Sequence, residues 1–108
     1  MAAPFHLDIL AASVPFYRGD CVSLVVPTAD GEFGILADHC NAVGAICAGE
    51  LRFETAEGEV RRAAVAPGLF KIEDGRVLLL VDAAERPEDI DVNRALRARE
   101  EAEEQLRQ

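Results

Sequence analysis

The residues best suited to chemistry lie in one short stretch, Gly31 to His39. It holds a carboxylate, Glu32, an aromatic ring, Phe33, and an imidazole, His39, and its two glycines are typical of turns. Irregular segments between strands commonly carry binding residues on a rigid scaffold. The same residues also fit a plain hairpin end whose apolar side chains belong to the core. The stretch is therefore a candidate binding segment, and the hairpin is the alternative.

Motifs for catalysis and metal binding are absent from the sequence. It has no nucleotide-binding glycine loop, no G-x-S-x-G elbow and no H-E-x-x-H zinc motif, which argues against an enzyme. His39 and Cys40 are adjacent, but neighbouring side chains rarely point at one ion, so we expect no metal site. The three cysteines, Cys21, Cys40 and Cys47, show no C-x-x-C spacing and indicate unpaired thiols in a reducing compartment.

Length and charge restrict the function further. The chain has 108 residues, of which 50% are hydrophobic and 29% charged, as in one folded domain. A net charge of −9 argues against nucleic-acid binding, which needs a basic surface, and against lying on anionic lipid. The longest apolar run, residues 77–81, is far shorter than the ~20 residues that span a bilayer. The amino terminus lacks the pattern of a signal peptide, so we expect no membrane insertion.

Hydrophobic alternation with a period of two indicates strands through most of the chain. Asp74-Gly75 is the strongest turn signal, because both central residues of a type I′ turn need positive φ. We also expect a turn at Arg18-Gly19-Asp20 and a strand end at Pro27. The predicted strands cover residues 5–9, 14–17, 21–26, 43–47, 51–55, 60–65, 69–73 and 76–81. This pattern predicts a mainly β fold, a β-sandwich or barrel-like closed sheet of about eight to ten short strands.

For two of these strands, the sequence also predicts which side chains are buried. In residues 21–26, apolar residues occupy both alternating sets of positions, so both faces of this strand should be covered. In residues 51–55, Leu51, Phe53 and Thr55 should point inward and the two residues between them outward.

The composition changes after Asp82. Residues 83–89 form a polar connector, and the Ala-, Arg-, Glu- and Leu-rich residues that follow predict a helix over 92–107, about 24 Å long. Asp91 is well suited to cap its amino end. One narrow face of small residues makes this helix marginal alone, so we expect it to lie against a neighbour.

Together these segments resemble the epsilon subunit of the rotary ATP synthase, which is called delta in mitochondria. The resemblance rests on the order and spacing of Phe5 to Ile9, Gly31 to Leu36, His39, Gly68, and Ile90 to Ala95. It implies a β-sandwich domain over residues 1–84, then a linker and single helix over 85–108. The family usually has a two-helix hairpin there, and the second helix is absent from this sequence.

The resemblance implies a non-catalytic central-stalk subunit, peripheral on the cytoplasmic face of the inner or plasma membrane. In this family the sandwich clamps the gamma subunit and stands on the ring of c subunits, so that torque passes between ring and shaft. The catalytic beta subunits are a further expected partner, although one helix should inhibit ATP hydrolysis little. The position matching Glu32 contacts the c ring, and those matching His39 and Gly44 lie toward gamma. The implied partner-binding residues are Glu32, Phe33, Gly34, Ile35, His39 and Gly44.

Some bacterial members of the family bind ATP as a regulatory ligand. The matching positions are Glu85, Ile90, Asp91, Arg94 and Ala95. Asp91 is equally explained as a helix cap, and we favour the cap. We therefore expect no cofactor, with ATP at most a weak ligand.

A different class of function stays open beside this one. A small β-sandwich can serve as a binding module for a sugar or a metal ion. Asp38-His39 is the one candidate ligand pair for such a module in the sequence.

Overall fold

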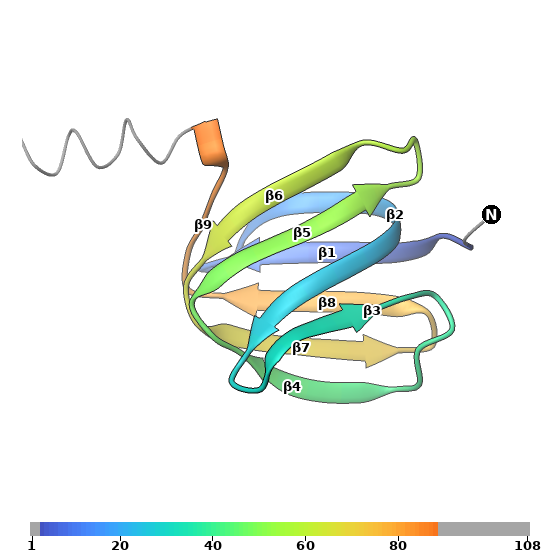
Figure 1. The fold of residues 1–108 in the computed structure, drawn as a ribbon, viewed down its shortest axis with the longest axis horizontal. Coiled ribbons are helices and arrows are strands. Elements are labelled where there is room, and N and C mark those ends of the chain that lie inside the picture. The colour runs from blue at the N-terminus through green and yellow to red at the C-terminus, as the bar shows by residue number, and fades with distance from the viewer. Residues whose placement is uncertain (1–2, 89–108) are drawn as a thin grey trace, which may run out of the picture.

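The computed structural model describes residues 3–88 and shows a β-sandwich of nine strands (Figure 1). The strands are β1 (Phe5–Ala11), β2 (Val14–Thr28), β3 (Gly31–Ile35), β4 (Ala42–Ile46), β5 (Gly49–Thr55), β6 (Val60–Val65), β7 (Gly68–Glu73), β8 (Arg76–Val81) and β9 (Ala84–Glu85). The predicted mainly β class is confirmed, while the helix predicted over 92–107 lies outside the described residues. Within residues 3–88, no helix is long and apolar enough to cross a membrane.

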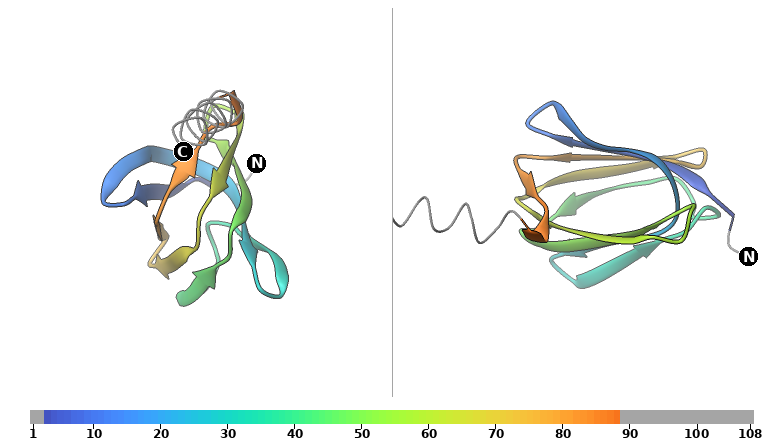
Figure 2. Two further views of the ribbon diagram at one scale, coloured as in Figure 1. Left: turned by 90° about the vertical axis from the view of Figure 1, so that its left-hand side faces the viewer. Right: turned by 90° about the horizontal axis from the view of Figure 1, so that it is seen from above.

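Strand β2 belongs to both layers of the sandwich. Its first half pairs with β1, and the sheet continues from β1 through β8 and β7 to β4. Its second half pairs with β3 on one side and with β5 on the other, and β5 leads on to β6 and β9. Figures 1 and 2 show the two layers, which we call the first sheet (β4-β7-β8-β1-β2) and the second sheet (β3-β2-β5-β6-β9). The β1–β8 pair is parallel, whereas the other pairs of described strands are antiparallel.

The core lies between the sheets and takes the inward side chains of each strand. In β1, Phe5, Leu7 and Ile9 are buried as predicted, and His6 and Asp8 lie on the outer face. The largest fully buried side chains are Leu7, Ile9, Cys21, Leu24, Val26, Ile35, Leu51 and Leu79. Alternation along each strand thus leaves two outer faces on which partners can bind.

Strand β2 runs through two segments that the sequence assigns to a turn and a strand end. The predicted turn at Arg18-Gly19-Asp20 is wrong, because these residues pair in register with residues 6–8 of β1. Pro27 does not end the strand, which continues to Thr28. Pro27 lies opposite Glu32 of β3, and its carbonyl accepts the Cys47 N–H at 2.9 Å.

A β-bulge explains why residues 21–26 carry apolar side chains at both alternating sets of positions. Cys21, Leu24 and Val26 are buried, but the other residues of this segment are only half-buried, so the expectation of two covered faces is wrong. The pairing of β2 with β5 shifts between Cys21 and Ser23. An extra residue at a bulge reverses the alternation, so Cys21 and Leu24 both point inward although they are three apart.

Strand β9 is missing from the set predicted from the sequence. It lies inside residues 83–89, which were assigned to a connector, and its two residues pair with Val65 and Ala64 of β6. A two-residue strand has no measurable alternation, so the pattern cannot reveal it.

Candidate partner-binding surfaces

The stretch from Gly31 to His39 is a hairpin strand followed by a loop. Residues 31–35 form β3, which pairs with the end of β2, so the hairpin interpretation holds for this part. Ile35 is buried in the core, whereas Leu36 is 53% exposed. Glu32 lies near one end of β3 and His39 lies beyond the other. The two residues do not form one site, because side chains alternate along a strand: His39 contacts the Phe33 ring, whereas Glu32 points to the other face of β3 and binds Arg52.

An aromatic cluster forms at the loop end of β3. The Phe33 ring stacks on Phe70 of β7 with centroids 5.3 Å apart, and the His39 ring meets the edge of Phe33 at 5.2 Å. The His39 ring is fixed by a 2.7 Å contact between its Nδ1 and the Cys40 carbonyl. Gly44 of β4 lies directly against the Phe70 ring. The structure therefore brings together Phe33, His39 and Gly44 of the predicted site residues.

Glu32 makes a different set of contacts on the outer face of the second sheet. Its two carboxylate oxygens accept from the two terminal nitrogens of Arg52, at 3.2 and 2.8 Å. Arg52 comes from β5, so this fork reaches across β2. The hydrogen bonds from Arg52 lower the pKa of Glu32 below its usual value. Glu32 is therefore ionised at neutral pH but already paired.

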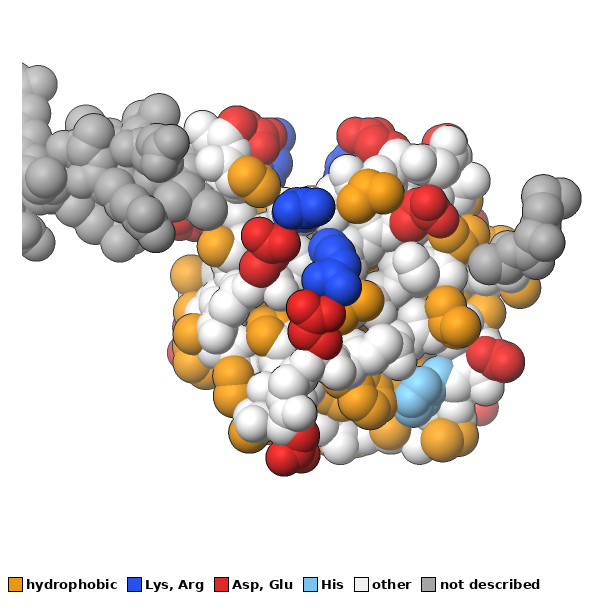
Figure 3. All heavy atoms as spheres, in the orientation of Figure 1, with side chains coloured by type: hydrophobic (Ala, Val, Ile, Leu, Met, Phe, Trp, Pro, Cys, Tyr) orange, Lys and Arg blue, Asp and Glu red, His pale blue; other side chains and the backbone are white. Residues whose placement is uncertain are grey.

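Further charged side chains continue this arrangement across the second sheet. Arg62 of β6 lies 3.7 Å from Glu50 of β5. Figure 3 shows positive and negative side chains alternating across the centre of this face. The face therefore carries balanced, mutually paired charges.

The outer face of the first sheet is apolar at one end. Cross-strand partners Ala45, Leu69, Leu80 and Leu10 follow one another across four strands, and Val43 lies beside Ala45 on β4. Exposed fractions are 71% for Val43, 53% for Leu69 and 44% for Leu80. We call these five residues the apolar strip. A row of this kind across a sheet face is typical of a surface that another protein covers.

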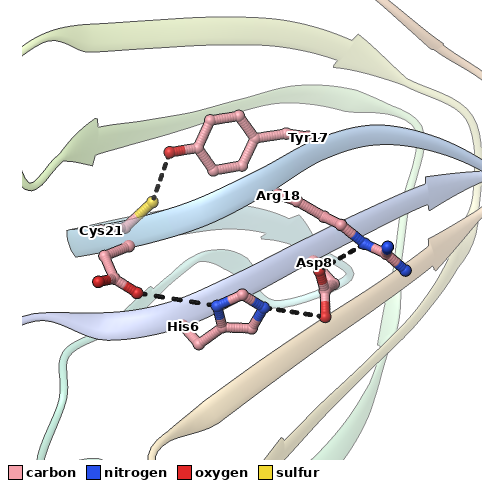
Figure 4. A network of polar contacts seen from close by, with 6 residues as sticks. His6, Asp8, Tyr17, Arg18 and Cys21 are labelled. Atoms are coloured by element: carbon pink, nitrogen blue, oxygen red, sulfur yellow. Dashed lines mark hydrogen bonds and ion pairs between the residues drawn. The ribbon is translucent and has the colours of Figure 1, made fainter.

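The neighbouring part of the same face is charged. His6 lies between two carboxylates, 3.2 Å from Asp8 and 3.7 Å from Asp20, and Arg18 binds Asp8 at 3.1 Å (Figure 4). The two carboxylates contact opposite nitrogens of the imidazole, so the three groups do not converge. Among residues 3–88, no three acidic, His or Cys side chains are placed to hold one metal ion.

A groove of about 740 Å³ lies between the first half of β2, β6 and residues 84–88. Tyr17 lines it, with Phe53 at 4.6 Å between ring centroids and the Arg61 guanidinium 5.5 Å from the ring centre. Burial, followed by the contact with Cys21, raises the pKa of Tyr17 to about 12. Glu85 also lines the groove, while the other predicted nucleotide residues, Ile90, Asp91, Arg94 and Ala95, lie outside the described residues.

Sequence reasoning missed Arg52, Phe70 and the apolar strip. Each depends on pairing between strands that are distant in the sequence. The outward position of Arg52 between buried Leu51 and Phe53 was predicted, but its partner on β3 was not. Gly34 and Ile35 do not join either cluster, since a Cβ built at Gly34 would meet no atom within 4 Å and Ile35 belongs to the core.

Comparison with known proteins gives one consistent result. A sequence model of the β-sandwich domain of the ATP synthase delta/epsilon chain matches residues 4–87. The ATP synthase epsilon chain of Ruminiclostridium cellulolyticum is 40% identical over 104 residues, which cover 96% of this chain and 77% of the relative. That of Caldicellulosiruptor bescii is 41% identical over 106 residues, which cover 98% and 77%.

Two solved structures share the fold. A chain of the Euglena gracilis mitochondrial ATP synthase, in a structure of OSCP, F1 and the c-ring, matches with a TM-score of 0.79 and 25% identity. The match covers 95% of this chain and 66% of that one. A chain from the central stalk and c-ring of the Tetrahymena thermophila enzyme matches with a TM-score of 0.69 at 10% identity, covering 82% and 71%.

Proposed function

This chain belongs to the ATP synthase delta/epsilon family, and we propose that it is the central-stalk rotor subunit that couples the ring of c subunits to the gamma shaft. Nothing in this role requires chemistry on a substrate. We therefore assign it no catalytic activity and give the synthesis of ATP to other subunits of the complex.

The apolar strip is the observation that carries this proposal. Three of its side chains are about half or more exposed, although aliphatic side chains in a row across four strands would be better buried. Covering such a row with a complementary apolar surface provides roughly 25 cal/mol for each Å² removed from water. The gamma subunit is the partner that the proposed role requires on this face. Gly44 lies on β4 between Val43 and Ala45 of the apolar strip, and His39 lies on the loop that leads into β4, which supports their assignment to the same contact.

The second contact of a coupling subunit must lie elsewhere on the sandwich. Glu32 lies on the other sheet, near the β2–β3 turn, where a polar partner can reach it. We assign this edge to the polar loops of the c ring. The two contacts then lie on different sheets, as a subunit held between two partners requires.

The location follows from the proposed partners. A chain between the c ring and gamma is peripheral to the membrane, and we place it on the cytoplasmic face, beside the catalytic head. The alternative function, a binding module for a sugar or a metal ion, has less support. Asp38 and His39 are neighbours in the loop between β3 and β4, and the imidazole already contacts the Phe33 ring and the Cys40 carbonyl.

Leu69→Asp tests the proposal, with Val60→Asp as its matched control. Both residues are exposed aliphatic side chains on strands, at 53% and 58%, but Val60 lies on β6 of the second sheet. We expect Leu69→Asp to weaken binding to purified gamma by about tenfold or more, since burying an unpaired carboxylate costs well over ~1.4 kcal/mol.

The control should bind gamma as the natural chain does, and both variants should melt near its temperature, because both sites are exposed. ATP synthesis driven by a proton gradient in reconstituted vesicles should fall with Leu69→Asp alone. Equal gamma binding by both variants would show that the apolar strip is not the contact.

A further inference from the structure

The pair of Glu32 and Arg52 is the feature of the second sheet that the family role does not explain. Glu32 stands on an edge strand, 61% exposed, where an isolated glutamate would sample many rotamers. The guanidinium holds both carboxylate oxygens at once, at 3.2 and 2.8 Å, which fixes the plane of the carboxylate as well as its position.

We propose that Arg52 is a positioning residue for Glu32 and that the neutral pair is the unit that meets the c ring. This inference rests on the proposed function, because it specifies how the ring-facing edge is recognised. Each carboxylate oxygen gives one acceptor position to Arg52 and keeps others toward solvent.

The charge balance of the pair defines the chemistry of its partner. A lone carboxylate would select a cation, but this carboxylate already faces a guanidinium, so its remaining acceptor positions favour neutral donors. Backbone N–H groups or a side-chain amide of a ring loop fit this requirement. Arg62, on the same face, lies 3.7 Å from Glu50 in a looser, single contact and does not hold a carboxylate in a fixed plane.

A purely structural role is the competing explanation for the pair. Since the fork reaches from β5 across β2 to β3, it can also clamp the hairpin onto the sheet. Both roles predict a change in the Arg52→Ala variant, so one substitution does not separate them. The charge-swapped variant, Glu32→Arg with Arg52→Glu, does, because it restores a clamp but puts a cation at position 32.

The experiment measures proton-driven ATP synthesis in vesicles holding the complete complex. The variants are Glu32→Ala, Arg52→Ala, Arg52→Lys, the double alanine and the charge swap, with Arg62→Ala as the control. We expect Arg52→Ala to lose about as much coupling as Glu32→Ala, the double variant to lose no more, and Arg52→Lys to lose part of it. The swap should stay impaired while its melting temperature matches that of the natural chain, and Arg62→Ala should couple normally.

A second readout follows the carboxylate itself. In the isolated chain, Arg52→Ala should raise the Glu32 pKa to its ordinary value, measured by NMR titration, because Arg52 is the main cause of its lowering. Glu73, whose pKa is lowered by Lys71, should not change in this variant.

Several outcomes would overturn the inference. Full coupling by the charge-swapped variant would show that the pair only holds the hairpin onto the sheet. Additive losses of coupling in the double alanine variant would show that the two residues act independently. Normal coupling by the Arg52→Ala variant would show that Arg52 has no role in the contact with the c ring. If Leu69→Asp uncouples the complex while all variants of the pair couple normally, this inference alone fails. If Leu69→Asp and deletion of the chain also leave coupling intact, the proposed function fails.

Discussion

Gly44 and Phe70 touch so closely that no side chain fits at position 44. A Cβ built there would overlap the Cζ and Cε1 atoms of the ring. The ring itself is 5% exposed and stacked on Phe33, so it has little room to move away. The glycine therefore lets β4 lie over the aromatic cluster at the border of the apolar strip.

Gly44→Ala should destabilise the chain by about 1–3 kcal/mol, the usual cost of overpacking a filled site. Gly34→Ala is the control, because a Cβ at Gly34 meets no atom within 4 Å and its φ is not positive. Urea denaturation followed by circular dichroism compares the two. Equal midpoints for both variants would mean that Phe70 yields to the new methyl group at no cost.

Tyr17 should make stability fall in alkaline solution. Burial raises its pKa from 10.0 to about 12, so ionisation favours the unfolded chain. The stability from the neutral phenol is complete below about pH 10 and declines as the pH rises toward 12. Tyr17→Phe should remove this part of the decline.

The titration can be read directly, because Tyr17 is the single tyrosine of the chain and there is no tryptophan. Tyrosinate absorbance of the folded chain should have its midpoint near pH 12 and that of the chain in denaturant near pH 10. A folded midpoint near pH 10 would show that the phenol is in free contact with water.

The three thiols should react in a fixed order. Cys40 is exposed, Cys47 is intermediate and Cys21 is buried, and burial also raises the Cys21 pKa. Since the thiolate is the reactive form, a disulfide reagent should modify Cys40 fast, Cys47 more slowly and Cys21 only in denaturant. Cys40→Ser should abolish the fast phase, and three equal rates would contradict the burial of Cys21.

ATP should bind the isolated chain no more tightly than in the millimolar range. The chain has a net charge of −9, and one proposed residue, Glu85, is held in β9 by its pairing with Ala64. From the sequence alone, we expect Asp91 to serve as a helix cap rather than as an ATP ligand. Titration calorimetry with ATP measures the affinity. Micromolar binding that Arg94→Ala abolishes would establish a regulatory site in this segment.

Local patterns in the sequence were enough to place most strands and their faces. Leu51, Phe53 and Thr55 are buried as the alternation of β5 requires. The turn at Asp74-Gly75 has φ of 50° and 78°, as a type I′ turn needs. These features depend on residues that are neighbours in the chain.

The features that the sequence did not predict have a different origin, because they depend on pairing with strands that are far away in the sequence. Arg18-Gly19-Asp20 has the composition of a turn but is held straight by residues 6–8 of β1. Arg52 could be placed on an outer face, but only the order of strands puts it within reach of Glu32. The sequence therefore named candidate residues such as Glu32 and His39, but not the side chains that they contact in the fold.

The parallel pairing of β1 with β8 also governs how the chain can fold during synthesis. His6 pairs with Arg76, so β1, an inner strand of the first sheet, leaves the ribosome long before its partner β8. At roughly 5–20 residues per second, some 4–14 seconds separate the two. During that interval the β1–β2 hairpin exposes an unpaired edge and an uncovered apolar face. The nascent chain should therefore be most vulnerable to aggregation, and most in need of a chaperone, until β8 has emerged.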